Sequence, residues 1–269
     1  MTAPAVSVLM AVRNGAPWVR EAAQSVLTQT ASDLELIVID DGSTDGTTDV
    51  LASIDDARLR VERQPPRGLT PSLNRALSLA RAPLIARLDA DDLAVPERLA
   101  CQRRFLDAHP GIGLLGAAAR EVDTSGREVG IVMPPEEDAA IRHALIRRNP
   151  FVHSSVMARR SVLIDVGGYD ERLPVAQDYD LWMRMSRITL LANLGTPLVV
   201  RRLLPDRVSA TRDTERLATE ARVKWRAVRS GAYPWWCVVF ILKPLTGLLV
   251  PTAFRGALRR ARARQRAVS

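Results

Sequence analysis

Short runs of continuously apolar residues alternate, in the N-terminal third of the chain, with longer segments whose apolar side chains recur every three or four residues. After Pro17, for example, Val19, Ala22, Val26 and Leu27 fall on one face of a helix. The apolar runs are short and bounded by polar turns, which predicts buried strands. The predicted strands cover residues 6–12, 34–39, 58–61 and 83–89, and the predicted helices cover residues 17–27, 44–54 and 70–80.

This alternation of strand and helix indicates an α/β fold. Near-continuous apolar strands separated by helices predict a mostly parallel sheet with helices on both faces. The remaining expected elements are a helix over 98–108, a strand over 112–119, a hairpin over 122–133, a helix over 137–147, a strand over 151–158, and helices over 161–166 and 179–185, the last one preceded by a loop that holds residues 177 and 178.

Carboxylates directly follow two of the predicted strands. Asp40 and Asp41 follow the second strand, and Asp89, Asp91 and Asp92 follow the fourth. Like charges this close raise one another's pKa unless a cation or hydrogen-bond donors lie among them. The carboxyl ends of parallel strands meet at the edge where ligands bind, and hard divalent cations prefer oxygen ligands. The pattern predicts a metal–diphosphate site at this edge; the alternative is that each cluster only caps the helix after it.

The composition limits the compartment and the partners. The chain has 269 residues, of which 47% are hydrophobic and 25% charged, which is typical of a globular protein with room for an α/β domain and an appendage. Cys101 and Cys237 offer neither a disulfide framework nor a zinc spacing, which favours a reducing cytoplasmic setting. The start of the chain has no basic region, and its apolar run over 5–12 is too short for a secretion signal, so we interpret it as the first strand.

The polar motifs of the chain follow one another in a specific order. They are Asn14, Asp40-Asp41-Gly42-Ser43-Thr44-Asp45-Gly46-Thr47, Arg67-Gly68-Leu69, Asn74, Asp89-Ala90-Asp91-Asp92, His153-Ser154-Ser155-Val156-Met157, Gly167-Gly168-Tyr169-Asp170 and Gln177-Asp178-Tyr179-Asp180-Leu181-Trp182. In this order and spacing, over about residues 5–200, the set resembles the family 2 inverting glycosyltransferases. The resemblance implies a GT-A, Rossmann-like fold and transfer of a sugar from a nucleotide-sugar donor to an acceptor hydroxyl.

The resemblance also implies roles for individual residues. Asp178 matches the general base, which takes the proton from the acceptor hydroxyl. Asp91 would bind Mn²⁺ or Mg²⁺ together with the donor diphosphate. Asp41 would accept a hydrogen bond from the nucleobase, and Asp89 would lie near the ribose. The full set expected to bind the nucleotide sugar is Ala11, Arg13, Asp41, Arg67, Asp89 and Ala90.

Three positions depart from the family's pattern or have two interpretations. Arg13 stands where the family usually has tyrosine or a similar residue, and it would either stack on the base or reach a phosphate. Gln177 replaces the glutamate that commonly precedes the general base, which removes a charge and leaves Asp178 in place. His153 would either complete the metal site or contact phosphate, or it is a structural hydrogen-bonding residue.

Beyond the region of resemblance the chain becomes amphipathic, then apolar, then basic. A helix over 211–230 has one apolar stripe, which would pack against the catalytic domain. The apolar segment over 233–250 begins with Trp235-Trp236 but is interrupted by Lys243-Pro244. A membrane span takes about 20 apolar residues, so we expect an interfacial or shallow hairpin segment instead.

The net charge of +8 gathers toward the C-terminal end. The arginines that follow the apolar segment are Arg255, Arg259, Arg260, Arg262, Arg264 and Arg266. They would be attracted to anionic lipids. Nucleic acid would use the same charges but would not explain the neighbouring apolar run, and no nucleic-acid module is recognisable. We therefore predict an anionic membrane surface, and no nucleic acid, as the partner of this tail.

The sequence predicts two parts, a catalytic domain over 1–205 and a membrane-associating tail over 206–269. The predicted protein is a metal-dependent inverting glycosyltransferase, cytoplasmic and peripherally attached to the inner face of the cell membrane, with a lipid-linked or envelope glycan as acceptor. One alternative is a non-catalytic nucleotide-sugar-binding scaffold of the same fold, which would not need carboxylates at both the metal and the base positions. The other is a sugar nucleotidyltransferase, which should carry a Gly-rich basic loop after the first strand; residues 13–15 are a poor version of that loop.

Overall fold

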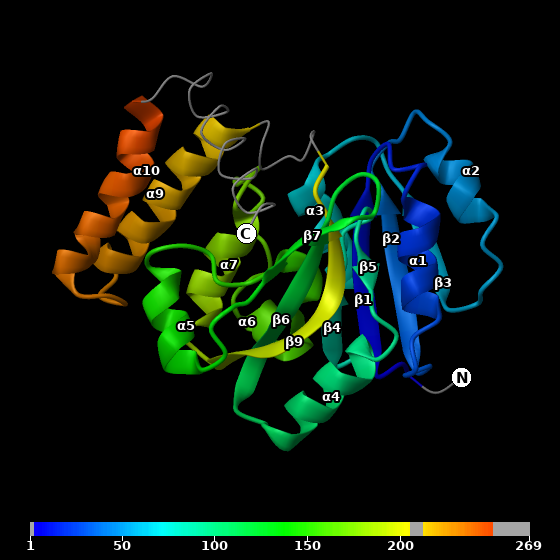
Figure 1. Cartoon of the computed structure of the whole chain (residues 1–269), viewed down its shortest axis with the longest axis horizontal. Helices are drawn as coiled ribbons and strands as arrows, with labels where there is room; N and C mark the ends of the chain where they lie inside the picture. The colour runs from blue at the N-terminus through cyan, green and yellow to red at the C-terminus, as the bar shows by residue number, and fades with distance from the viewer. Residues whose placement is uncertain (1–2, 205–211, 250–269) are drawn as a thin grey trace.

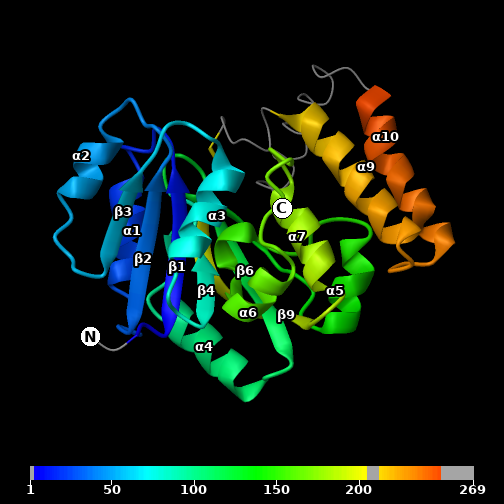
Figure 2. The ribbon, with the colours of Figure 1, turned by 180° about the vertical axis from the view of Figure 1, so that it is seen from behind.

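A mixed β-sheet runs through the centre of the protein, and helices cover both of its faces (Figure 1 and Figure 2). The computed structural model describes residues 3–204 and 212–249. Its strands are β1 (Val6–Val12), β2 (Leu34–Asp40), β3 (Leu59–Arg63), β4 (Leu84–Arg87), β5 (Leu93–Ala94), β6 (Ile112–Val122), β7 (Glu128–Val132), β8 (Met157–Arg159) and β9 (Leu190–Arg202). Its helices are α1 (Val19–Leu27), α2 (Thr47–Ala52), α3 (Leu69–Leu79), α4 (Arg98–Ala108), α5 (Asp138–Leu145), α6 (Arg160–Asp165), α7 (Gln177–Met185), α9 (Asp213–Arg229) and α10 (Val239–Leu249), with the 3-10 helices η1 (His153–Ser155) and η2 (Trp235–Val238).

The strand order is β3-β2-β1-β4-β8-β6-β9-β5, with β7 paired to β6 outside that path. The strands from β3 to β4 are parallel, and Val6 at the start of β1 pairs with Leu34 on one side and Leu84 on the other. β8 runs antiparallel to both β4 and β6, whereas β6 and β9 are parallel. The predicted α/β fold with helices on both faces is confirmed, and its sheet is mixed because β5, β7 and β8 run antiparallel to their neighbours.

Alternating side chains along β1 contribute to two cores, one on each face of the sheet. Val8 and Met10 pack on the side of α1 and α4, whereas Leu9 packs on the side of α3. The apolar stripe predicted for α1 is buried and consists of Val19, Ala22, Ala23, Val26 and Leu27. Because β1, β2 and β4 are parallel neighbours, the loops that follow them meet at one edge of the sheet.

Two predicted boundaries are wrong, and both lie next to residues with predicted chemistry. The strand expected over 151–158 is instead η1 followed by the short β8. The expected strand is interrupted at Ser155. The Ser155 hydroxyl accepts a hydrogen bond from the backbone N–H of Ala117 on β6 and donates one to the carbonyl of Ala117, both at 3.0 Å, so that a side chain takes the place of backbone pairing. The last helix of the sheet region begins at Gln177, earlier than expected, so Asp178 lies in the first turn of α7 and not in a loop. A carboxylate is favourable in that turn because the helix dipole is positive there.

The C-terminal helices α9 and α10 lie side by side at one end of the molecule (Figure 1). The predicted helix over 211–230 is confirmed as α9, and its Val223 and Ala227 belong to the same hydrophobic core as Tyr179 and Leu181 of α7. None of the helices that the structure describes combines the length and the apolar character needed to cross a bilayer. The predicted arginine-rich tail over 255–266 lies outside the described residues.

Candidate active site

The segment that leaves β4 reverses direction and returns as β5, and this turn carries the predicted metal-binding carboxylates. The backbone N–H of Asp92 donates to the carbonyl of Asp89 at 3.2 Å, which closes the turn. One carboxylate oxygen of each of Asp89, Asp91 and Asp92 lies within 4.8 Å of the others. The sequence places three like charges in four residues, and the turn brings them to one point at the carboxyl edge of the sheet.

A buried arginine compensates the first of these charges. Arg87 is the last residue of β4. Its guanidinium donates hydrogen bonds to Asp89 and, at 3.0 Å, to the hydroxyl of Ser154. Burial would raise the pKa of Asp89, but the charge and hydrogen bond of Arg87 lower it to about 2. The Ser154 hydroxyl also lies 2.9 Å from Asp89 and in contact with Asp92. Asp89 is therefore ionised and fixed in place by the protein itself.

The protein compensates the charge of the other two carboxylates only in part. Burial and the neighbouring charge of Asp89 raise the pKa of Asp91 to about 6 and that of Asp92 to about 7. Asp92 accepts hydrogen bonds from Ser154 and, at 2.9 Å, from the backbone N–H of Arg202. Within the described ranges, the Asp91 carboxylate accepts no hydrogen bond from another residue. Three hard oxygen donors at one point, of which only Asp89 is paired with an arginine side chain, fit Mg²⁺ or Mn²⁺.

The predicted general base, Asp178, is held by a neighbour that the sequence does not single out. The side-chain amide of Asn149 donates to Oδ2 of Asp178 at 2.7 Å. Burial raises the pKa of Asp178 because the ionised form is poorly solvated there. A raised pKa and a fixed orientation both suit a carboxylate that must accept a proton.

Tyr169 is a buried residue whose side chain contacts His153. Its hydroxyl lies 2.9 Å from Nε2 of His153. Burial raises the pKa of Tyr169, and the charges of Asp178 and Asp89 raise it further. That the predicted base and the predicted metal-binding turn form a single site stays a prediction.

His153 contacts Tyr169 and does not join the carboxylate group. Its Nε2 is engaged by Tyr169, and burial lowers the pKa of the imidazole, so the ring is neutral. The residues whose ligand atoms come together in the described part of the chain are the three aspartates of the turn. This arrangement favours the structural interpretation of His153, and its role as a metal ligand stays a prediction.

The predicted nucleobase contact, Asp41, anchors a loop. Its carboxylate accepts hydrogen bonds from Gln64 Nε2 at 2.8 Å, from the backbone N–H of Arg67 at 2.8 Å and from that of Gly68 at 2.7 Å. Gly68 has φ of 100°, which a residue with a side chain rarely adopts, so the loop needs glycine there. A hollow of about 480 Å³ opens beside this loop, lined by residues 42–44 and 63–66.

The remaining predicted nucleotide contacts lie around the same edge. Ala11 is partly buried near the end of β1, Arg13 is exposed just beyond it, and Ala90 is partly buried in the carboxylate turn. The β1 loop is tied to the β2 loop: the Asn14 N–H donates to the Ser43 hydroxyl at 2.9 Å, and Asn14 Oδ1 accepts the N–H of Thr44 at 2.8 Å. Their contact with a nucleotide stays a prediction, although the structure does gather them at one edge.

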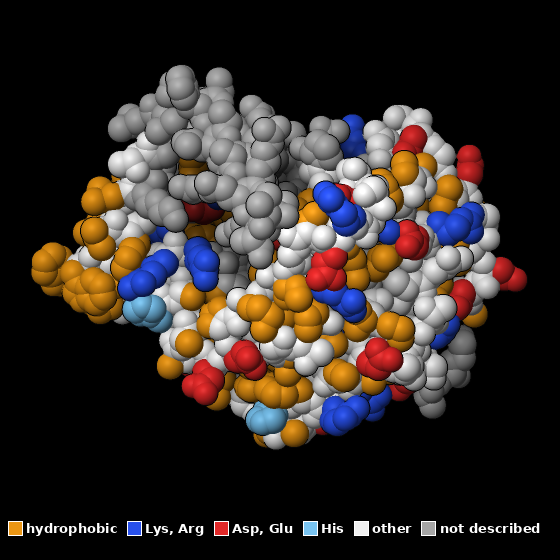
Figure 3. All heavy atoms as spheres, in the orientation of Figure 1, with side chains coloured by type: hydrophobic (Ala, Val, Ile, Leu, Met, Phe, Trp, Pro, Cys, Tyr) orange, Lys and Arg blue, Asp and Glu red, His pale blue; other side chains and the backbone are white. Residues whose placement is uncertain are grey.

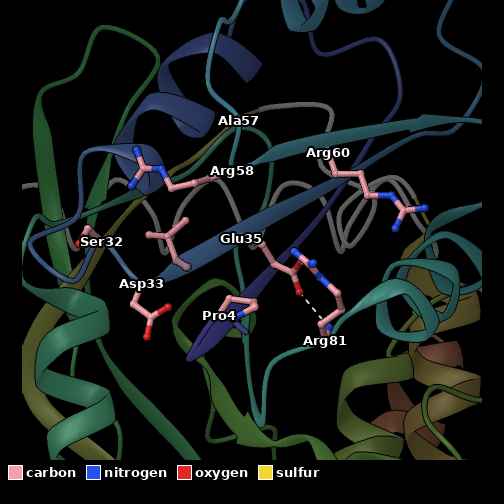
Figure 4. A pocket seen from close by; sticks show the side chains of 9 residues that line it. Pro4, Ser32, Asp33, Glu35, Ala57, Arg58, Arg60 and Arg81 are labelled. Atoms are coloured by element: carbon pink, nitrogen blue, oxygen red, sulfur yellow. Dashed lines mark hydrogen bonds and ion pairs between the residues drawn. The ribbon is translucent and has the colours of Figure 1, made fainter. Parts of the chain in front are cut away.

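A second hollow, of about 430 Å³, lies at the opposite edge of the sheet (Figure 4). Its charged lining side chains are Asp33, Glu35, Arg58, Arg60 and Arg81. Each arginine is already paired: Arg81 with Glu35 at 2.8 Å, Arg58 with Asp56 at 2.7 Å and Arg60 with Glu62 at 2.8 Å. No predicted site residue lines it, so it is separate from the site described above.

Four residues that shape the site are missing from the sequence-based assignment: Arg87, Asn149, Ser154 and Arg202. A signal existed for Arg87, because a charged residue inside a buried strand needs a partner. No signal marks Asn149 or Arg202, since each acts on an aspartate that is distant in the sequence.

The chain is similar in sequence to known proteins. Residues 7–167 match the model of the family described as Glycosyl transferase family 2. The chain is 30% identical to EpsE of Bacillus subtilis (strain 168), which is named as a glycosyltransferase, over 257 residues that cover 93% of this chain and 91% of EpsE. It is 31% identical to AmsE of Erwinia amylovora, named as an amylovoran biosynthesis glycosyltransferase, over 186 residues that cover 68% of this chain and 69% of AmsE.

The fold is also found among solved structures. The chain is similar to the mannosyltransferase PcManGT from Pyrobaculum calidifontis in complex with GDP-Man and Mn²⁺, with a TM-score of 0.65 and 20% sequence identity. The similarity covers 100% of this chain and 84% of that one. At this identity the likeness concerns the fold alone, and it confirms the fold class expected from the sequence.

Proposed function

The chain belongs to glycosyl transferase family 2, and on that basis we propose that it is a metal-dependent inverting enzyme that moves a sugar from a nucleotide-sugar donor to a hydroxyl of a lipid-linked or envelope glycan. The observation that carries the proposal is the convergence of three carboxylates in the turn after β4, and a separate buried carboxylate with a raised pKa, Asp178, supports it. The names of AmsE and PcManGT support a glycan acceptor and a nucleotide-sugar donor.

Asp178 is the proposed base. Its carboxylate takes the proton of the acceptor hydroxyl while the acceptor oxygen forms a bond to the anomeric carbon. The bond from that carbon to the diphosphate oxygen breaks on the opposite face, and its electron pair leaves with the nucleoside diphosphate. One displacement with one base inverts the configuration. Asn149 holds the carboxylate by one oxygen, which keeps it oriented during the transfer.

Asp91 is the proposed metal ligand, with Asp89 and Asp92 beside it. A divalent cation held there supplies Lewis-acid stabilisation of the charge that develops on the departing diphosphate. Arg87 keeps Asp89 ionised and fixed, so the turn presents a constant arrangement of oxygens. The proposed nucleotide-sugar contacts are Ala11, Arg13, Asp41, Arg67, Asp89 and Ala90.

We expect the protein to bind one class from a panel of UDP-, GDP- and dTDP-linked sugars, and to bind it only with Mn²⁺ or Mg²⁺ present. Without metal, the diphosphate meets uncompensated carboxylates in the turn. Removal of metal with EDTA should therefore weaken binding by roughly 100-fold, about 2.7 kcal/mol. Isothermal titration calorimetry of each donor, with and without metal, measures this difference in affinity and identifies the nucleobase of the preferred donor.

Asp33→Asn is a matched control for this experiment, because it removes an exposed carboxylate at the opposite edge of the sheet (Figure 4). It should bind the donor as the wild type does. If a folded wild-type protein binds no member of the panel with either metal, the enzyme proposal fails.

We also propose that the C-terminal helices attach the protein to an anionic membrane surface. Exposed apolar side chains gather over α9, η2 and α10, at the end of the molecule that lies at the left in Figure 3. The most exposed is Trp235, at 81%, followed along the chain by Trp236 at 53%. Contiguous exposed apolar side chains indicate an interaction surface, and tryptophan favours the membrane interface.

Replacing both residues with serine, Trp235→Ser with Trp236→Ser, should weaken binding to vesicles that contain anionic lipid by at least about tenfold. Partial burial of two such side chains contributes on the order of 1 kcal/mol each at ~25 cal/mol per Å². Because both side chains are largely solvated in the folded protein, the melting temperature should change little. Vesicle co-sedimentation measures the loss.

Ile188→Ser is the control for the membrane experiment. It removes an exposed apolar side chain, 56% accessible, that follows α7 and lies outside the C-terminal helices. Its vesicle binding should equal that of the wild type. If the double tryptophan variant sediments with vesicles as the wild type does, these helices are not the attachment surface.

A further inference from the structure

Arg202, the last residue of β9, connects three parts of the protein around the carboxylate turn. Its Nη1 donates to the backbone carbonyl of Asp91 at 2.9 Å, and its Nη2 donates to Glu21 on α1 at 2.5 Å. Its guanidinium also lies over the ring of Trp18, 4.8 Å from the centroid. The backbone N–H of the same residue donates to Asp92 at 2.9 Å.

These contacts act on the turn at the point where its geometry matters most. The turn is held at its far end by β5, where Leu93 pairs with Val200 of β9. Between β4 and β5, the direction of the Asp91 side chain depends on the orientation of its own peptide unit. Arg202 bonds the carbonyl of that unit, and the ion pair with Glu21 and the ring of Trp18 fix the guanidinium.

We propose that Arg202 is a positioning residue of the metal site: by holding the Asp91 carbonyl, it fixes the direction in which the Asp91 carboxylate is presented to a divalent cation. The inference rests on the proposed metal-dependent function. A planar fork suits this role because it donates to two acceptors and stacks on an aromatic ring at the same time.

The sign of the effect separates this role from a simple effect of charge. A cation beside a metal site repels the metal, so loss of the Arg202 charge alone would tighten Mn²⁺ binding. Loss of a positioning contact would weaken it. The two accounts therefore predict opposite results for the same variant.

Arg201 offers a matched control on the neighbouring position of β9. It forms an ion pair with Glu121 on β6, as Arg202 does with Glu21 on α1, and its side chain points to the other face of the strand. Arg201→Ala removes the same charge from the same strand end and leaves the contacts of Arg202 with the carboxylate turn in place.

The experiment is a Mn²⁺ titration followed by electron paramagnetic resonance, with Mn²⁺ alone and again with UDP or GDP. We expect Arg202→Ala to weaken Mn²⁺ binding at least fivefold, and Arg201→Ala to stay within twofold of the wild type. Arg202→Lys keeps the charge but cannot hold Glu21 and the Asp91 carbonyl together, so it should also bind Mn²⁺ more weakly than the wild type. Melting temperatures show which variants are folded, and if Arg202→Ala is not, Arg202→Lys carries the test.

Wild-type or tighter Mn²⁺ binding by a folded Arg202→Ala would overturn the positioning role, as would wild-type binding by Arg202→Lys. Asp91→Ala separates this failure from failure of the proposed function. If the wild type binds Mn²⁺ and Asp91→Ala does not, the metal site is supported. The Arg202 variants then test the role of Arg202 alone. If the wild type binds no Mn²⁺ under any of these conditions, the metal site and the inference both fail.

Discussion

Asp178→Asn is expected to lower kcat for sugar transfer by about 10²–10⁴-fold, the usual contribution of a general base. Asparagine has the same shape and keeps an oxygen that can accept the hydrogen bond from Asn149, but it cannot take a proton from the acceptor hydroxyl. Donor affinity should stay near the wild-type value, because the proposed base does not contact the nucleotide. Steady-state kinetics with donor and acceptor varied separately measures both quantities.

The same variant should melt at the wild-type temperature or above it. Burial raises the pKa of Asp178 above its ordinary value of 3.8, so the folded state holds the ionised carboxylate less favourably than the unfolded state does. At neutral pH the ionised group therefore opposes folding, and a neutral amide removes this cost. A gain in stability with a loss of transfer is the pattern expected of a residue kept for function.

Asp180→Asn, two positions along α7, should behave in the opposite way. Asp180 is buried and forms ion pairs with Arg184 at 2.8 Å and with Arg226 of α9 at 3.2 Å. Loss of its charge removes the counter-ion of Arg184 and leaves Arg226 with Asp170 alone, at 3.7 Å, so the melting temperature should fall while measurable transfer remains. If Asp178→Asn retained more than about a tenth of the wild-type kcat, Asp178 would not be the base.

The sequence predicts the N-terminal half of the fold well because β1, β2 and β4 are almost entirely buried, whereas the edge strand β3 is partly exposed. An apolar run such as Leu34–Asp40 packs against helices on both faces and so leaves a clear pattern in the sequence. β9 escapes prediction for the opposite reason. Its middle contains Asn193, Gly195 and Pro197, and the register with β6 shifts there, so no regular alternation appears in the sequence.

The site is predictable in its charged residues and not in the contacts that hold them. The three aspartates of the turn are adjacent in sequence, so their convergence can be read directly. Asn149 reaches Asp178 across 29 positions, and Arg202 reaches Asp91 across 111, distances over which no local pattern operates. The roles of such residues follow from the topology that brings β9 back beside β5.

Asp91→Asn is expected to abolish metal-dependent donor binding and to lower kcat/KM by at least about 10³-fold, since Lewis-acid stabilisation contributes several kcal/mol. Asp91 is the carboxylate in the turn with free ligand capacity, whereas Asp89 is engaged by Arg87, and Asp92 by Ser154 and Arg202. Calorimetry with Mn²⁺ and the donor identified from the panel measures the loss of binding, and initial rates measure the loss of turnover.

Thermal stability gives this prediction a second, independent measurement. The pKa of Asp91 is about 6 in the folded protein against 3.8 for an unperturbed aspartate. The stability of the metal-free wild type relative to Asp91→Asn should therefore fall as the pH rises from about 4 to about 6. Above this range, Mn²⁺ with donor should raise the melting temperature of the wild type, because a ligand that binds the folded state stabilises it, and should leave Asp91→Asn unchanged. An equal rise in both proteins would show that the metal binds elsewhere, and retained turnover in Asp91→Asn would remove Asp91 from the mechanism.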